Sequence, residues 1–127
     1  MFEIAVEESF AAGHALRGYK GKCENVHGHN YKIRVILAGK SLDSVGLLYD
    51  FVELRKQMAA VIHSLDHRFL NELPPFTELN PSAENIAKYF YDELAKRLAP
   101  AANGARVRAV TVFETDTTTA TYTPDRP

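Results

Sequence analysis

The sequence predicts an α+β fold in which a four-stranded antiparallel sheet carries two helices on one face. Two segments with β-type alternation come first, two segments with apolar residues at helical spacing follow, and two β-rich segments come last. The resulting order, ββααββ, favours neighbouring antiparallel strands covered by a separate helical layer. Since no repeat or linker interrupts the 127 residues, we expect a single domain over residues 1–127.

The predicted strands lie near the two ends of the sequence. Residues 2–12 (FEIAVEESFAA) carry β-favouring residues in rough alternation, and residues 30–39 (NYKIRVILAG) alternate more clearly. The glycines and charges of the intervening stretch, GHALRGYKGKCENVHG, indicate a long loop. Residues 106–115 (RVRAVTVFET) and 118–124 (TTATYTP) are the last two predicted strands, with a turn between them.

Polar residues mark the starts of both predicted helices. Asp50, with Glu53 three residues later, is typical of a capping box, and Ser82 directly follows Pro81 as a natural N-cap. Apolar residues then recur at helical spacing, which predicts a stripe that packs on the sheet. The stripe of the first helix is Phe51, Leu54, Met58, Val61, Ile62 and Leu65, and that of the second is Ala83, Ile86, Ala87, Phe90, Leu94 and Leu98.

The composition disfavours several classes of partner and location. A net charge of −1 gives no electrostatic reason to expect nucleic acid or an anionic membrane as a partner. The first ten residues contain three acids and no base, which argues against a signal peptide, and no apolar run is long enough to span a membrane. One cysteine cannot form an internal disulfide, which fits a reducing compartment. We therefore expect a cytoplasmic protein without nucleic-acid or membrane partners.

Three histidines are candidate metal ligands. His27 and His29 are two residues apart at the start of a predicted strand, so both imidazoles project from the same face. His14 ends the preceding strand, and pairing of the two strands would bring all three rings to one end of the sheet. Three histidines with a vacant fourth position are the pattern of a catalytic zinc site. Solvated or hydrogen-bonded histidines would give the same spacing.

Cys23, four residues before His27, has three interpretations. A lone buried cysteine is more often a small hydrophobic residue than a nucleophile. Lys22, a nearby zinc ion and the histidines would instead favour a reactive thiolate, and a loop would leave it accessible. Direct ligation of zinc by Cys23 is the third interpretation, since cysteine and histidine mix readily in zinc sites.

Two further polar features suggest acid–base or binding chemistry. Asp66 directly precedes His67, and a carboxylate beside an imidazole can fix its tautomer, although a helix-end aspartate and a solvated histidine would look the same. His63 and His67 are i,i+4 neighbours, but the glutamate of an HExxH motif is missing, which disfavours a metal pair.

Glu114 ends an apolar strand, where either a planar ligand with an N–H and an amino group or water would satisfy its carboxylate.

These motifs together resemble the 6-pyruvoyltetrahydropterin synthase / 6-carboxytetrahydropterin synthase family of the tunnelling fold, or T-fold. The resemblance covers nearly the whole chain and runs through six stretches in the family's order: ESFAAGHAL, CENVHGHNY, GLLYDFVELRK, LDHRFLNEL, NPSAENIA and VFETDTTTATY. It implies a lyase whose sheets close into an oligomeric barrel, and we expect a homohexamer, a dimer of trimers, with active sites between subunits.

The resemblance also implies a role for each candidate residue. The positions that match the family's zinc ligands are His14, His27 and His29. Those that match its catalytic cysteine and Asp-His pair are Cys23, Asp66 and His67. Those that match its substrate-binding residues are Glu114, which would anchor the pterin ring, and Ser82, whose hydroxyl would help to hold it.

The spacing Cys-x3-His-Gly-His resembles the bacterial queuosine-pathway branch, whereas biopterin-making synthases usually have a longer gap. That branch converts 7,8-dihydroneopterin triphosphate to 6-carboxytetrahydropterin, acetaldehyde and triphosphate. Glu24 leaves a second reaction open, because Cys-Glu-x-x-His-Gly-His is similar to a bifunctional subgroup that also forms 6-hydroxymethyl-dihydropterin. The motifs are also compatible with formation of 6-pyruvoyltetrahydropterin, or with a zinc- and pterin-binding module without turnover. Leu16 stands where a basic residue is frequent, which leaves four candidates for triphosphate contacts: Arg17, Lys20, Lys22 and Arg68.

Overall fold

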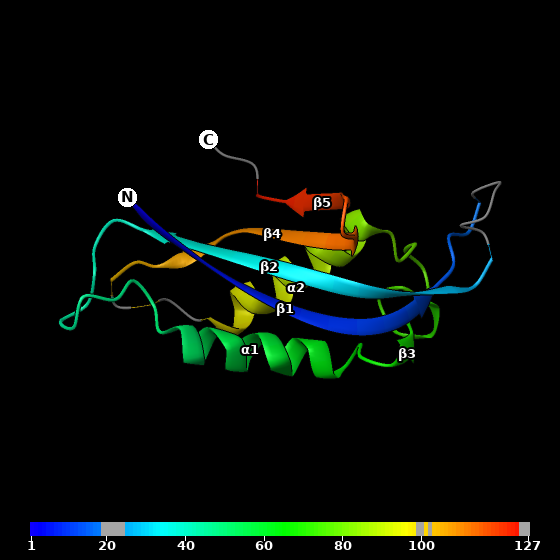
Figure 1. The fold of residues 1–127 in the computed structure, drawn as a ribbon, viewed down its shortest axis with the longest axis horizontal. Coiled ribbons are helices and arrows are strands. Elements are labelled where there is room, and N and C mark those ends of the chain that lie inside the picture. The colour runs from blue at the N-terminus through cyan, green and yellow to red at the C-terminus, as the bar shows by residue number, and fades with distance from the viewer. Residues whose placement is uncertain (19–24, 99–100, 102, 125–127) are drawn as a thin grey trace.

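The helices and strands follow the predicted order, with one short strand added (Figure 1). A computed structural model describes residues 1–18, 25–98, 101 and 103–124. The elements are β1 (Phe2–His14), β2 (His27–Gly39), α1 (Phe51–His63), β3 (Arg68–Phe69), a 3-10 turn η2 (Leu70–Glu72), α2 (Ala83–Arg97), β4 (Arg106–Thr115) and β5 (Thr118–Tyr122). The predicted α+β class is confirmed.

The sheet has five strands in the order β3-β1-β2-β4-β5, one more than the sequence predicts. β1 and β2 form a long antiparallel ribbon whose register runs from Phe2 opposite Gly39 to His14 opposite His27. The additional strand, β3, pairs in parallel with the end of β1, so the sheet is not wholly antiparallel. Two residues are too few to alternate visibly, and for this reason β3 gives no periodic signal in the sequence.

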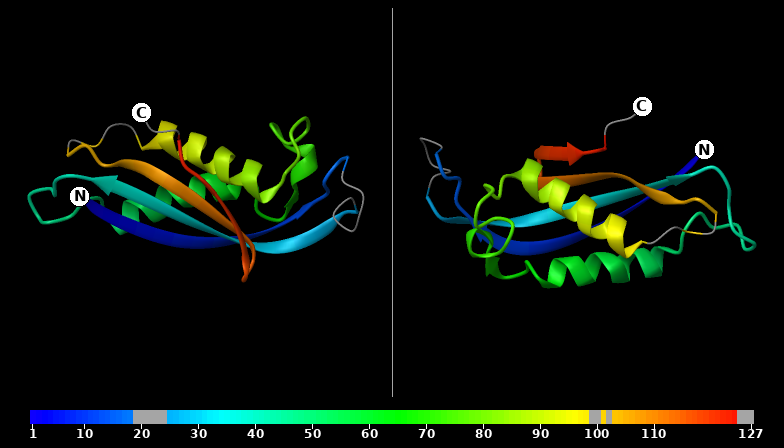
Figure 2. Two further views of the ribbon diagram at one scale, coloured as in Figure 1. Left: turned by 90° about the horizontal axis from the view of Figure 1, so that it is seen from above. Right: turned by 180° about the vertical axis from the view of Figure 1, so that it is seen from behind.

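Both helices cover one face of the sheet, as predicted (Figure 2). Alternate residues of β1 and β2 face the helices, and Phe10, Ile33 and Val35 are buried there. Complete burial of an apolar side chain of this size contributes about 1.5–3 kcal/mol. Phe51 departs from the predicted stripe, since it is 52% exposed in the first turn of α1. The buried residues of the two helices are Leu54, Met58, Val61 and Ile62, and Ala83, Ile86, Ala87, Phe90 and Leu94.

The predicted helix starts are confirmed by their side-chain caps. Asp50 Oδ1 accepts a hydrogen bond from the Val52 amide at 2.8 Å, and Ser82 Oγ accepts one from the Asn85 amide at 3.1 Å. Each cap satisfies an amide that the first helical turn leaves free and is worth about 1 kcal/mol. Glu53 does not close a capping box, because its carboxylate accepts from a side-chain amide one turn later at 2.9 Å. Neither α1 nor α2 is long and apolar enough to cross a membrane.

The face of the sheet opposite the helices is polar. Glu7 pairs with Arg34 at 2.6 Å and with Lys32 at 3.8 Å, and both cations lie over the Phe113 ring. Within the described residues, the outer edge of β5 and most of the outer edge of β1 have no neighbouring strand. Open edges of this kind favour pairing with another chain.

Candidate functional site

The three histidines that the sequence nominates as metal ligands lie together at one end of the sheet. The register of β1 and β2 places His14 directly opposite His27, and His29 lies two residues further along the same face. The ring centroids are 4.4 Å apart for His14 and His27, 4.8 Å for His27 and His29, and 5.1 Å for His14 and His29. We call these three side chains the histidine cluster.

Hydrogen bonds fix the orientation of two of the rings. Nδ1 of His14 lies 2.7 Å from the carbonyl oxygen of Pro81, and Nδ1 of His27 lies 2.7 Å from that of Asn25. Since a carbonyl oxygen can only accept, we assign the hydrogen of each ring to Nδ1 and a lone pair to Nε2. A second partner of this kind is the usual arrangement for a histidine that ligates a metal.

The remaining ring nitrogens fit a metal ion. The Nε2 atoms of His14 and His27 are 2.9 Å apart, and in the assigned tautomers neither can donate to the other. Two lone pairs that face each other so closely repel unless a cation neutralises them. Nε2 of His29 is buried and has no hydrogen-bond partner within the part of the chain that the structure describes. Burial lowers the pKa of His14, which keeps its imidazole neutral and able to ligate.

Glu114, at the end of β4, adds a carboxylate to the histidine cluster. Its Oε1 is 3.2 Å from Nε2 of His29 and 4.0 Å from Nε2 of His14. One ligand atom from each histidine and one from Glu114 all lie within 4.8 Å of one another. Three imidazoles and a carboxylate are a donor set that suits zinc. Glu114 is 26% exposed and faces the histidines, and its role as an anchor for a planar ligand stays a prediction.

Ser82 lies beside the same cluster, next to the residue that binds His14. Its Oγ accepts the Asn85 amide as the cap of α2, and Pro81 directly precedes it. A hydroxyl that accepts one hydrogen bond still has its own hydrogen to donate. The contact with a ligand that the sequence predicts for Ser82 therefore stays a prediction that the local geometry allows.

Asp66 and His67 form a close pair in the turn after α1. Asp66 Oδ1 is 3.0 Å from Nδ1 of His67 and accepts a hydrogen bond from the Ala11 amide at 3.0 Å. The Ala11 amide, and to a smaller extent His67, lower the pKa of Asp66, so this carboxyl stays ionised. The His67 amide in turn donates to the Ala11 carbonyl oxygen at 2.6 Å. Both residues are thereby attached to the edge of β1.

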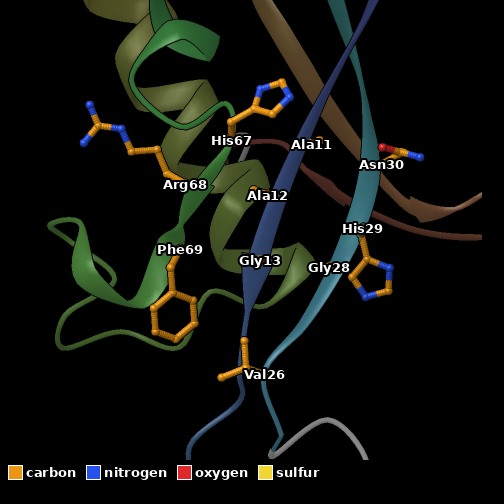
Figure 3. A pocket seen from close by; sticks show the side chains of 10 residues that line it. All are labelled: Ala11, Ala12, Gly13, Val26, Gly28, His29, Asn30, His67, Arg68 and Phe69. Carbon is orange, nitrogen blue, oxygen red and sulfur yellow. The ribbon is translucent and has the colours of Figure 1, made fainter.

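Within one chain this pair lies apart from the histidine cluster. His67 borders a hollow of about 500 Å³, which Phe69, Gly13, Gly28 and His29 also line. Figure 3 shows the His67 imidazole at the edge of β1 and the His29 ring beyond β2, with both strands between them. Ala11 binds the pair through its backbone amide and carbonyl, which point along the sheet, so Asp66 and His67 lie at the outer edge of β1. Among the described residues, no hydrogen bond or ion pair joins the Asp66–His67 pair to the histidine cluster.

His67 has a left-handed backbone with φ of +60°, which costs a non-glycine residue about 1–3 kcal/mol. His67→Gly and His67→Ala both remove the imidazole and its contact with Asp66, but only glycine relieves the backbone. We expect the glycine variant to be more stable than the alanine variant by about 1 kcal/mol in urea unfolding. Equal stabilities of the two variants would show that the backbone is not strained.

Two asparagines that no sequence pattern singles out hold the chain just after β1. The Asn71 side chain binds both the amide and the carbonyl of Ala15, at 2.9 and 2.8 Å, and Asn80 binds both groups of Arg17 at 2.8 Å. We call Asn71 and Asn80 the asparagine clamps. The Arg17 guanidinium also donates to two loop carbonyl oxygens at 3.1 and 3.3 Å, which occupies a group that the sequence nominates for triphosphate binding.

The remaining nominated residues are less informative. Four of them lie outside the described residues, so their predicted roles stay predictions: Lys20, Lys22, Cys23 and Glu24. Arg68 is exposed beside the hollow that His67 borders. His63 is exposed on α1 and belongs to no group of three or more potential metal ligands among the residues that the structure places.

Comparison with known proteins decides the family. The sequence profile of the family described as 6-pyruvoyl tetrahydropterin synthase matches residues 3–125. The chain belongs to this family. Its members process small pterin molecules, and the match spans every element that carries a candidate site residue.

Members of the family with two different names are similar to the chain. The 6-carboxy-5,6,7,8-tetrahydropterin synthase of Bacillus subtilis is 32% identical over 131 residues, with 98% of this chain and 87% of that protein covered. The human 6-pyruvoyl tetrahydrobiopterin synthase is 35% identical over 106 residues, with 80% and 70% covered. Similarity to both names leaves the individual reaction undecided.

The solved structures agree with the fold. The structure of Caenorhabditis elegans 6-pyruvoyl tetrahydropterin synthase matches with a TM-score of 0.86 at 30% identity, and the match covers 98% of this chain and 96% of that one. The predicted T-fold is thereby confirmed, apart from the additional short strand β3.

Proposed function

We propose that the protein is a zinc-dependent 6-carboxy-5,6,7,8-tetrahydropterin synthase. It would convert 7,8-dihydroneopterin triphosphate to 6-carboxytetrahydropterin, acetaldehyde and triphosphate in queuosine biosynthesis, as a cytoplasmic lyase formed by residues 1–127. The observation that carries the proposal is the pair of Nε2 atoms on His14 and His27 that face each other at 2.9 Å. Carbonyl oxygens hold the opposite nitrogen of each ring, so this end of the sheet is prepared to receive a cation.

The binding residues would hold the two ends of the substrate. Zinc bound by the histidine cluster would polarise the hydroxyl groups of the pterin side chain and make the neighbouring protons more acidic. The Glu114 carboxylate accepts hydrogen bonds from the N–H and amino groups of the pterin ring, and the Ser82 hydroxyl helps to hold the ring. Because Glu114 lies next to the histidine cluster, the pterin ring would bind beside the zinc that contacts the pterin side chain.

Three residues would move the protons. Cys23, four residues before His27 in the sequence, acts as the general base that removes a proton from the side chain. His67, oriented by Asp66 at 3.0 Å, returns or relays a proton on the other side. Triphosphate leaves by elimination, and cleavage of the remaining side chain with addition of one water molecule releases acetaldehyde and leaves the carboxylate on the ring.

Subunit assembly would complete this arrangement. His67 is 81% exposed, and in one chain it is attached to the strand edge away from the histidine cluster. A neighbouring subunit would bring its own Asp-His pair to this chain's cluster, and the open edges of β1 and β5 offer surfaces for strand pairing. We propose a homohexamer, a dimer of trimers, with active sites between subunits.

Product identification tests the function directly. Purified protein with zinc is incubated with dihydroneopterin triphosphate, and the pterin products are separated and identified by mass spectrometry. The proposal requires 6-carboxytetrahydropterin with acetaldehyde. A 6-pyruvoyl or 6-hydroxymethyl product would instead assign one of the related reactions, and bound but unchanged substrate would indicate a zinc- and pterin-binding module.

Glu114→Gln is expected to weaken pterin binding while zinc stays bound. The change removes the charge that accepts the ring hydrogens, an interaction of about 1.5–3 kcal/mol, which corresponds to a roughly ten- to hundredfold loss of affinity. Titration with neopterin, an oxidised pterin that is not turned over, measures the effect, and Glu78→Gln, at an exposed glutamate, is the control. Unchanged neopterin affinity would show that Glu114 does not anchor the ring.

A further inference from the structure

Tyr31 is a buried tyrosine of β2 that the proposed function does not use. Its side chain is 0% exposed, and its hydroxyl makes no hydrogen bond within the described residues. A buried hydroxyl without a partner destabilises a fold, and few native proteins keep one without a reason. The position of Tyr31 relative to the histidine cluster suggests what that reason is.

The Tyr31 ring leans toward the histidine cluster. Tyr31 is opposite Phe10 in the register of β1 and β2, whereas His14 lies four residues further along β1, which is about 13 Å of strand. The ring centroids of Tyr31 and His14 are nevertheless only 5.8 Å apart, with the rings perpendicular at 90°. Tyr31 also meets the His29 ring at 5.5 Å. Tyr31 therefore forms the inner wall of the cluster.

Glu114 is the neighbour of Tyr31 on the adjacent strand. The paired register of β2 and β4 ends at Lys32 opposite Phe113, and Tyr31 and Glu114 are the next residues of the two strands. Both residues lie next to the same ring, since the ring centroids of Tyr31 and His29 are 5.5 Å apart. In the structure the Glu114 carboxylate lies 3.2 Å from Nε2 of His29.

We propose that the Tyr31 hydroxyl is the positioning group that holds Glu114 for pterin binding, an inference that rests on the proposed function. Nε2 of His29 lies 3.2 Å from Oε1 of Glu114 but makes no hydrogen bond within the described residues, and a metal ion on this nitrogen would leave it no hydrogen to donate to the carboxylate. The Tyr31 hydroxyl, on the neighbouring strand, then donates to one carboxylate oxygen. The second oxygen stays free to accept from the pterin ring.

A double-mutant cycle tests this coupling on the zinc-loaded protein, with neopterin as the probe. Tyr31→Phe is expected to weaken neopterin binding by roughly 10- to 100-fold, the usual effect of losing an outer partner that orients a site residue. Zinc content should be unchanged, and the melting temperature of the metal-free protein should be unchanged or higher, since the variant removes an unpaired buried hydroxyl. Added to Glu114→Gln, the same change should have no further effect on affinity.

Tyr89→Phe is the matched control. The Tyr89 ring, on α2, packs against the rings of Phe76 and Phe90 rather than against the histidine cluster. The proposal is overturned if Tyr31→Phe keeps wild-type affinity for neopterin. It is also overturned if the loss is equally large with Glu114 and with glutamine at that position, because Tyr31 would then not act through the carboxylate. Failure of the proposed function is distinct, since it appears in the product assay of the wild-type protein as a product other than 6-carboxytetrahydropterin, whatever the Tyr31 variants bind.

Discussion

Replacing His27 with alanine is expected to remove zinc from the protein. His27 supplies one of three clustered Nε2 atoms, and its loss leaves two histidine donors, too few for a stable zinc site because Glu114 is proposed as the pterin anchor and not as a ligand. The His27 ring is held through Nδ1 by the Asn25 carbonyl oxygen and lies at the end of the β1–β2 ribbon, outside the apolar core, so the variant should still fold. Metal analysis after purification and dialysis measures the zinc content per chain.

The control for this prediction is His63→Ala, which removes an exposed histidine from α1 and leaves the cluster intact. It should retain the zinc content of the wild-type protein. Full zinc occupancy in His27→Ala would contradict the assignment of the metal site, and circular dichroism would show whether a loss of metal reflects a loss of fold.

Replacing Cys23 with alanine is expected to lower the rate with dihydroneopterin triphosphate by about 10²–10⁴, the usual span for removing a positioned proton-transfer group. Zinc should remain bound, because the proposed ligands are the three histidines and not the cysteine. Single-turnover kinetics and metal analysis on the same sample separate these two effects. Full turnover by Cys23→Ala would overturn the proposed mechanism and leave the thiol as a packing residue or a neighbour of the metal.

Glu24→Ala provides the complementary measurement. If Glu24 supports a separate cleavage of unphosphorylated dihydroneopterin, this variant should lose the 6-hydroxymethyl product alone, while Cys23→Ala keeps some of it. Such a crossed pattern would assign a bifunctional enzyme. If Glu24→Ala changes neither product, Glu24 has no role in catalysis and the single-function synthase is favoured.

The fold follows from the sequence wherever an element is long enough to show its period. The thirteen-residue strands β1 and β2 and both helices have clear patterns, and their polar caps, Asp50 and Ser82, mark the helix starts. β3 escapes prediction because a two-residue strand has no period and is specified only by its neighbour, β1. The sequence also does not predict that Phe51 is exposed. Spacing gives the direction in which a side chain points around the helix axis, but not whether the sheet extends far enough to cover it.

The site is only partly predictable for a related reason. The histidines share two paired strands, so spacing alone brings His14, His27 and His29 together. The contact of Glu114 with His29 depends on the register between β2 and β4, which are far apart in the sequence. Asn71 and Asn80 act through backbone groups of another segment, and such contacts leave no periodic or compositional signal.

The asparagine clamps bear on how this site can change during evolution or design. Asn71 and Asn80 bind the chain after β1 only through backbone groups of residues 15 and 17, so they place no demand on the type of side chain at these positions. Substitutions at Ala15 or Leu16 can alter the charge next to the histidine cluster while His14 keeps its place, whereas Arg17 also donates side-chain hydrogen bonds to the loop. The side chains of this segment can therefore change while the asparagine clamps keep its backbone in place.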